Sequence, residues 1–211
     1  KTASSEEDST PLIYSDGLVR IDPLIADFPR VGARLAFRYD PAQAALRVAG
    51  PVNARGIAIQ GIGSAQANGN IEFALRGANP WTFRSTVGGR IANLTNSTIE
   101  NLAGNALSFR STLSANAGSP LRFGDLIIRS EEVDIAGNAS VGEGGFTIDV
   151  TGNHTRFGTF SADYSGEAGA NFATVRLASP LPAAGLRDVE LGIAPADDGF
   201  RIVSNGESLL G

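Results

Sequence analysis

The sequence predicts an all-β protein with one long, curled, antiparallel or mixed sheet and few or no helices. Apolar residues recur at every second position over most of the chain, which is typical of strands with one apolar face. Clusters of Gly, Asn, Asp and Pro separate these runs and indicate turns. The composition agrees, because 26 Gly and 10 Pro with only 7% aromatic residues favour many turns.

The alternation can be followed from strand to strand, with turn signals at 67–70, 77–80, 137–138, 142–145 and 197–199. Roughly 13 strands, at about 4.8 Å between neighbours, would make a sheet on the order of 60 Å wide. Such a sheet should curl rather than stay flat. The apolar positions that mark the strands are Leu35, Phe37, Tyr39, Leu46, Val48, Ile57, Ile59, Ile71, Phe73, Leu75, Leu107, Phe109, Val133, Ile135, Phe146, Ile148, Val150, Val175, Leu177, Val189, Leu191, Ile193, Phe200 and Ile202.

Two short stretches, 22–28 and 98–107, are the only ones with helix-like apolar spacing, and each contains or borders a breaker. Residues 1–10 carry no large apolar side chain and are expected to be a disordered leader or surface loop. Residues 11–211 are expected to form a single elongated β domain. Because the chain starts without Met and stops just after a strand-like run, we expect it to be a segment of a longer repeat protein.

Internal similarity supports an architecture built by repetition. The run 46–57 returns as 175–186, with Arg, Ala, Pro, Ala and Gly at matching positions and an offset of 129 residues from Arg47 to Arg176. Shorter echoes have offsets of 26 residues, from Phe83 to Phe109, and 33 residues, from Leu102 to Ile135. Repetition of this kind favours an extended β protein, and the unequal offsets argue against a solenoid with one rung length.

Composition excludes several classes of function. The chain has no cysteine, so thiol catalysis, disulfides and Cys-ligated zinc are excluded. With 17 basic and 22 acidic residues spread evenly, no basic patch for nucleic acid is indicated. No apolar run of about 20 residues could span a bilayer. Neither a metal site nor a cofactor is expected.

Residues that could catalyse a reaction are scarce. The single histidine, His154, stands in a Gly/Asn-rich run, and we expect it to be a solvated turn residue. Glu132 and Asp134, two residues apart on an expected strand, would face the same side about 7 Å apart, as a glycosidase pair could. Solvated charges on an outward face explain them as well, and we expect no enzymatic activity.

The strand, proline and glycine pattern of 175–189, followed by 191–195 and 198–202, resembles the periplasmic repeats of the bacterial AsmA-like clan. Within the clan it looks most like the YdbH and TamB group of inter-membrane bridge proteins. The resemblance implies a twisted, half-open, taco-like groove in the periplasm that carries phospholipid for outer-membrane biogenesis. It also implies an inner-membrane anchor outside this segment, with an outer-membrane protein as a further candidate partner.

This resemblance assigns the apolar alternation to a lumen that holds acyl chains. An acyl chain of about 15 methylenes gains on the order of 10 kcal/mol on leaving water, without any catalytic residue. The residues expected to line the lumen and bind lipid are Phe37, Ile59, Phe73, Phe83, Phe109, Ile135, Ile148, Leu177, Leu191 and Ile202.

Three other interpretations stay open. The same residues could fill the closed core of a β-sandwich or β-helix. A β-helical passenger or adhesin-type surface scaffold of a secreted protein is the alternative function. A carbohydrate-active enzyme on a β-helix, with Glu132 and Asp134 in its cleft, is the third.

Overall fold

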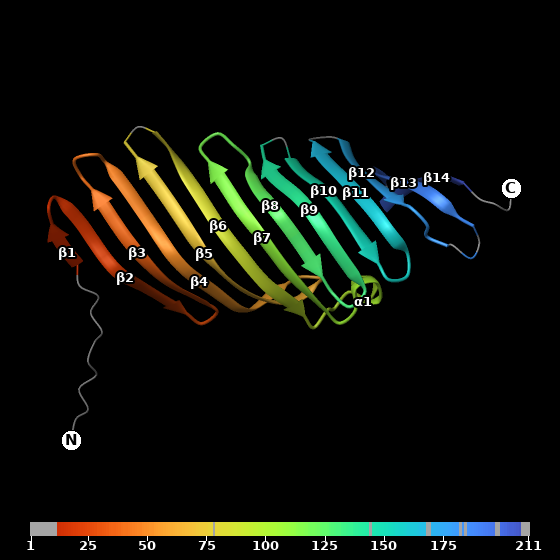
Figure 1. The fold of residues 1–211 in the computed structure, drawn as a ribbon, viewed down its shortest axis with the longest axis horizontal. Coiled ribbons are helices and arrows are strands. Elements are labelled where there is room, and N and C mark those ends of the chain that lie inside the picture. Colours follow the sequence, from red (N-terminus) through yellow and green to blue (C-terminus); the bar gives the residue numbers. More distant parts are fainter. Residues whose placement is uncertain are drawn as a thin grey trace, which may run out of the picture.

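The computed structural model describes residues 12–77, 79–143, 145–167, 170–181, 183, 185–196 and 199–207. They form one antiparallel sheet of fourteen strands whose spatial order equals their order in the chain (Figure 1). The strands are β1 (Leu12–Ser15), β2 (Leu18–Phe28), β3 (Val31–Asp40), β4 (Ala45–Ile59), β5 (Gly63–Arg76), β6 (Asn79–Ala92), β7 (Ala106–Asn116), β8 (Leu121–Arg129), β9 (Val133–Gly142), β10 (Gly145–His154), β11 (Gly158–Glu167), β12 (Ala170–Leu177), β13 (Arg187–Ala196) and β14 (Gly199–Glu207).

The sheet is a continuous meander that does not close on itself, because β1 and β14 each pair with one neighbour only. The all-β, antiparallel prediction is confirmed, and one short helix interrupts it. This order is not that of a β-helix, in which successive strands stack in parallel. The expected leader, 1–10, lies outside the described residues.

Strand register assigns almost every side chain to one of two faces, because residues directly opposite in an antiparallel pair point to the same side. Phe37 lies opposite Val48, which lies opposite Phe73, which lies opposite Phe83. We call the face that carries these residues the apolar face. The opposite side, which carries most of the arginines and carboxylates, is the polar face.

Three β-bulges keep the apolar side chains in phase along the strands. In β2 the register shifts between Ile21 and Leu24, so both side chains stay on the apolar face although they are three positions apart. The helix-like spacing at 22–28 therefore arises from a bulge within a strand. Similar shifts occur in β4, before Ile57, and in β8, before Leu126.

The second helix-like stretch is only partly helical. Helix α1 (Ser97–Ala103) begins after Asn96, whose side-chain oxygen accepts from the amides of Thr98 and Ile99 at 3.0 and 3.1 Å. It ends at Gly104, which has a φ of 75°. The residues from Ala106 onward belong to β7 instead.

The long sequence repeat is only partly a structural repeat. Residues 46–57 lie entirely within β4, whereas β12 ends at Leu177, so that most of 175–186 lies outside a strand. The matching glycines do share a conformation, with φ of 59° at Gly56 and 66° at Gly185. Likewise, the echo between 83–87 and 109–113 joins two adjacent strands that pair antiparallel.

Glycines on the apolar face mark sharp bends in the sheet. A Cβ added at Gly69 would lie 2.3 Å from the carbonyl oxygen of Thr86 on the next strand. The corresponding distances are 2.1 Å from Gly89 to the Gln66 oxygen, and 2.1 Å from Gly137 to the Asp149 oxygen. Backbones can approach so closely only where no side chain intervenes, and glycine at such positions allows a strand to coil strongly. The sheet therefore curls with glycine on the apolar side.

In the part of the chain that the structure describes, no second layer covers this sheet. Extensive contacts join each strand only to its neighbours in the sheet order. Among the described residues no large side chain is fully buried. The alternative of a closed β-sandwich or β-helix core is thus wrong.

Candidate functional site: the apolar face

All ten residues expected to line a lumen lie on the apolar face. The strand register connects them from strand to strand. Phe73 on β5 lies opposite Phe83 on β6, and Gly89, on the same face of β6, lies opposite Phe109 on β7. Similar pairs continue along the sheet as far as Ile193 opposite Ile202. The ten positions are Phe37, Ile59, Phe73, Phe83, Phe109, Ile135, Ile148, Leu177, Leu191 and Ile202. They lie on ten of the twelve strands from β3 to β14, all except β8 and β11, and the sheet between them is unbroken.

The apolar face is more sheltered than the polar face even though nothing covers it. Along β7, Leu107, Phe109, Ser111 and Leu113 are buried or half-buried, and every residue between them is exposed. Ser111 is only 3% exposed, and its hydroxyl donates to the Gly124 oxygen at 3.0 Å. On a single-layered sheet such shelter requires neighbouring side chains to converge. Together with the glycine bends, it indicates that the apolar face is concave.

Aromatic side chains gather toward one rim of this face, beside the turns between β3 and β4, β5 and β6, β9 and β10, and β11 and β12. The rings of Phe73 and Trp81 stack with centroids 6.3 Å apart, and those of Phe146 and Tyr164 lie 5.9 Å apart. Trp81 and Phe146 are each 37% exposed. Tyr and Trp combine an apolar body with a polar tip, which suits the border between an apolar surface and water.

The opposite rim is closed locally by α1 and His154, and the expectation of a solvated His154 is wrong. His154 ends β10, is 7% exposed, and its Nε2 lies 2.9 Å from the carbonyl oxygen of Leu102 in α1. Its Nδ1 accepts from the Arg156 amide at 3.0 Å, so the proton is assigned to Nε2, which donates to Leu102. The ring also lies 4.6 Å from that of Phe157.

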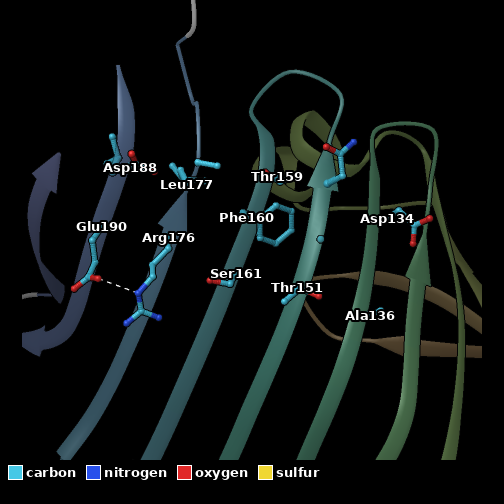
Figure 2. Close-up of a pocket in the computed structure, with 14 residues that line it drawn as sticks. Asp134, Ala136, Thr151, Thr159, Phe160, Ser161, Arg176, Leu177, Asp188 and Glu190 are labelled. Atoms are coloured by element: carbon cyan, nitrogen blue, oxygen red, sulfur yellow. Dashed lines mark hydrogen bonds and ion pairs between the residues drawn. The ribbon is translucent and has the colours of Figure 1, made fainter. Parts of the chain in front are cut away.

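A hollow lies on the polar face, toward the C-terminal end (Figure 2). It measures about 850 Å³ and is bordered by β9 to β13. Arg176 bridges Asp163 and Glu190 there, with contacts of 2.9 Å to each. The hydrogen bond to Asp163, and then that to Glu190, raises the pKa of Arg176, so the guanidinium stays charged. The side chains of Arg176, Asp163 and Glu190 are about half exposed and are paired with one another.

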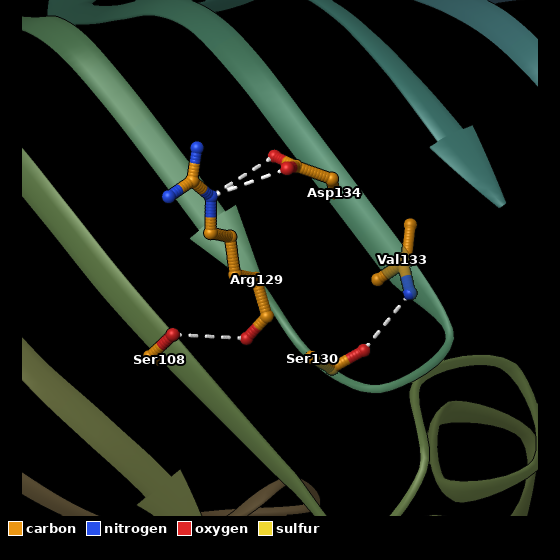
Figure 3. A network of polar contacts seen from close by, with 5 residues as sticks. All are labelled: Ser108, Arg129, Ser130, Val133 and Asp134. Carbon is orange, nitrogen blue, oxygen red and sulfur yellow. Dashed lines mark hydrogen bonds and ion pairs between the residues drawn. The ribbon is translucent and has the colours of Figure 1, made fainter.

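Glu132 and Asp134 do not form the strand-face pair that a glycosidase would need. Asp134 lies on β9 and pairs with Arg129 at 3.2 Å (Figure 3). Glu132 precedes β9, in a turn where the Ser130 hydroxyl accepts from the amides of Glu132 and Val133, and its carboxylate accepts from the Thr155 hydroxyl. The acidic runs at 6–8 and 197–198 lie outside the described residues.

Two further features bear on function. Within the part of the chain that the structure describes, no group of three or more His, Asp or Glu side chains could hold a metal ion. None of its helices is long and apolar enough to cross a membrane.

No family model, curated protein or solved structure matches this chain.

Sequence reasoning identified the apolar face but missed what shapes it. The contact between His154 and α1 joins residues far apart in the chain, and no local pattern reports it. The glycines at 69 and 137 belong to runs predicted as turns, 67–70 and 137–138, but both lie inside strands, as does Gly89. Their spacing from the apolar residues, always an even number of positions within the strand, was the available signal.

Proposed function

We propose that this chain is a periplasmic segment of an inter-membrane lipid transfer bridge that holds phospholipid acyl chains against its concave apolar face. The observation that carries the proposal is the uncovered apolar face itself, which continues across the fourteen strands. Soluble monomers rarely expose contiguous apolar patches larger than a few hundred Å². At about 4.8 Å per strand and about 3.3 Å per residue, this face is on the order of 2,000 Å².

The composition of the face fits an acyl chain better than a rigid protein partner. Small and aliphatic side chains, such as Ala65, Ile71 and Val87, dominate its centre, and glycines leave room between them. Adjacent positions along the sheet are therefore similar in energy for a methylene chain. Burial of each methylene contributes about 0.8 kcal/mol, so that a chain resting on the face would be retained but free to move along it.

The aromatic rim gives the bound lipid an orientation. Acyl chains would lie on the aliphatic centre, and headgroups would pass the rim formed by residues such as Trp81 and Tyr164 into water. Membership of the AsmA-like clan, an inner-membrane anchor and an outer-membrane partner belong to the same proposal. The proposal requires no enzymatic group.

Photo-crosslinking in living cells tests this function. A photoreactive residue would replace Phe73, Phe109 or Leu177 on the apolar face, with Arg84, Arg110 or Arg176 on the polar face as matched controls. We expect phospholipid adducts on the purified protein at the apolar positions only. Absence of adducts there, despite full incorporation, would contradict the proposal and favour a surface scaffold.

A further inference from the structure

Three arginines form an unbroken row across the polar face of the N-terminal strands. Arg20 on β2 lies directly opposite Arg38 on β3, and Arg38 lies directly opposite Arg47 on β4. Directly opposite residues in a sheet have Cβ atoms about 5 Å apart. Like charges at that separation destabilise a sheet, and neutral or acidic residues would be favoured there in the absence of another role.

The row is only partly neutralised by the protein. Arg47 pairs with Glu72 at 2.9 Å. Arg20 and Arg38 have no ion pair or hydrogen bond to any side chain among the described residues. Elsewhere on this face Arg129 and Arg176 each pair with a carboxylate. Two adjacent guanidinium groups are thus left to bind something else.

A hollow of about 390 Å³ lies beside these arginines. Arg76, also at the hollow, donates from Nη2 to the side-chain oxygen of Gln43 at 3.1 Å. Asp40 is the carboxylate at this hollow, and its Oδ1 accepts from the amides of Ala42 and Gln43 at 2.9 and 3.2 Å. The carboxylate is therefore held by its own turn and forms no ion pair with the row.

We propose that this hollow binds a phosphate-bearing anion through Arg20, Arg38 and Arg47. Guanidinium groups donate in a planar fork that matches phosphate oxygens, and arginine is favoured where such oxygens are recognised. Three arginines whose Cβ atoms lie about 5 Å apart along the row can converge on a diphosphate, or two of them on one phosphate. Further unpaired arginines on the same face, such as Arg84 and Arg110, would attract anions toward it.

The site lies on the face opposite to the proposed acyl-chain surface, so one lipid bound on the apolar face cannot fill it. The phosphate would belong either to a soluble small molecule or to headgroups of a bilayer against which the polar face rests. Both sources present the same chemistry to the arginines. The experiment therefore has one arm for each source.

The first arm is titration calorimetry of the whole chain with inorganic phosphate and pyrophosphate. The second is flotation with vesicles of phosphatidylglycerol mixed into phosphatidylcholine. The test variant is R20Q/R38Q, and the matched control is R90Q, because Arg90 is also exposed on the polar face but lies away from the hollow. Relief of like-charge repulsion predicts that R20Q/R38Q folds and resists denaturant at least as well as the wild type.

We expect saturable binding in at least one arm. The affinity should fall about tenfold for each arginine removed in R20Q/R38Q and less than twofold in R90Q. Pyrophosphate binding would identify a soluble ligand, and binding to phosphatidylglycerol vesicles alone would identify headgroups. Equal losses in both variants, or no saturable binding in either arm, would overturn the proposal. Binding to pure phosphatidylcholine vesicles reports the apolar face and should be the same in R20Q/R38Q and wild type, so failure of the two proposals can be distinguished.

Discussion

The ring of Phe109 lies directly over Gly89 on the neighbouring strand. A Cβ at Gly89 would come 2.7 Å from Cζ of Phe109 and 2.1 Å from the Gln66 carbonyl oxygen. The same arrangement recurs where a Cβ at Gly152 would come 2.6 Å from Cζ of Phe160. An aromatic ring packed on a glycine compensates for the missing side chain and stabilises the bend.

Substitution of Gly89 by alanine should therefore be strongly destabilising. The added methyl group meets backbone, which cannot move aside, and we expect a loss of about 2 to 3 kcal/mol in the free energy of unfolding. Gly88→Ala is the matched control, because a Cβ there points to the polar face with its nearest neighbour at 3.5 Å. Urea denaturation of both variants measures the difference, and equal losses would show that the bend does not require glycine.

His154 should hold α1 against the end of the sheet. His154→Phe keeps a ring beside Phe157 but removes both hydrogen bonds, which leaves the Leu102 oxygen and the Arg156 amide without their partner. We expect a loss of about 1 to 3 kcal/mol. Amide hydrogen exchange should accelerate in 97–103 and stay unchanged in β2 and β3. Uniform acceleration would instead indicate global destabilisation.

Arg176 should stabilise the C-terminal strands in a salt-dependent manner that is insensitive to pH near neutrality. Its pKa is raised above an ordinary value that already lies far above neutral pH, so its contribution is fully present below that value and is lost only as pH rises past the folded-state pKa. Arg176→Gln should lower thermal stability slightly and equally at pH 6 and pH 9, with a smaller effect at high salt. A change in the effect between these two pH values would contradict this account.

Acyl-chain binding should depend on which face a substitution alters. Leu113 and Ser114 are neighbours in β7, on the apolar and polar faces respectively. Leu113→Glu places a charge among converging apolar side chains and should weaken binding of a fluorescent fatty acid about tenfold. Ser114→Glu, between Arg84 and Arg122, should leave it unchanged. Equal affinities in the two variants would show that the fatty acid binds elsewhere.

Trp81, the single tryptophan, should report a lipid on the apolar face directly. It is 37% exposed and stacked on Phe73, so an acyl chain beside it would displace water and shift its emission to shorter wavelength. A fatty acid brominated near the end of its chain should quench this emission. If the brominated fatty acid binds but leaves the emission of Trp81 unchanged, the aromatic rim does not contact lipid.

The strands and their two faces could be predicted from sequence because both depend on local chemistry. A side-chain period of two places Phe73, Phe109 and Ile148 on one side wherever the chain is extended, and the glycine cluster at 142–145 marks the junction between β9 and β10. The failures occurred where glycine and asparagine lie inside strands, as in the predicted turns at 67–70 and 137–138, or where a contact spans many residues, as between His154 and Leu102.

The tertiary structure alone decided that the sheet is an open meander and that its apolar face is concave. Alternation of apolar and polar residues is equally compatible with a β-sandwich, a β-helix or an open groove. It shows which side chains favour burial but not which part of the protein covers them. That choice depends on strand pairing and on the backbone approach at glycines such as Gly69 and Gly137. The row formed by Arg20, Arg38 and Arg47 likewise exists only because register aligns three strands that the sequence keeps apart.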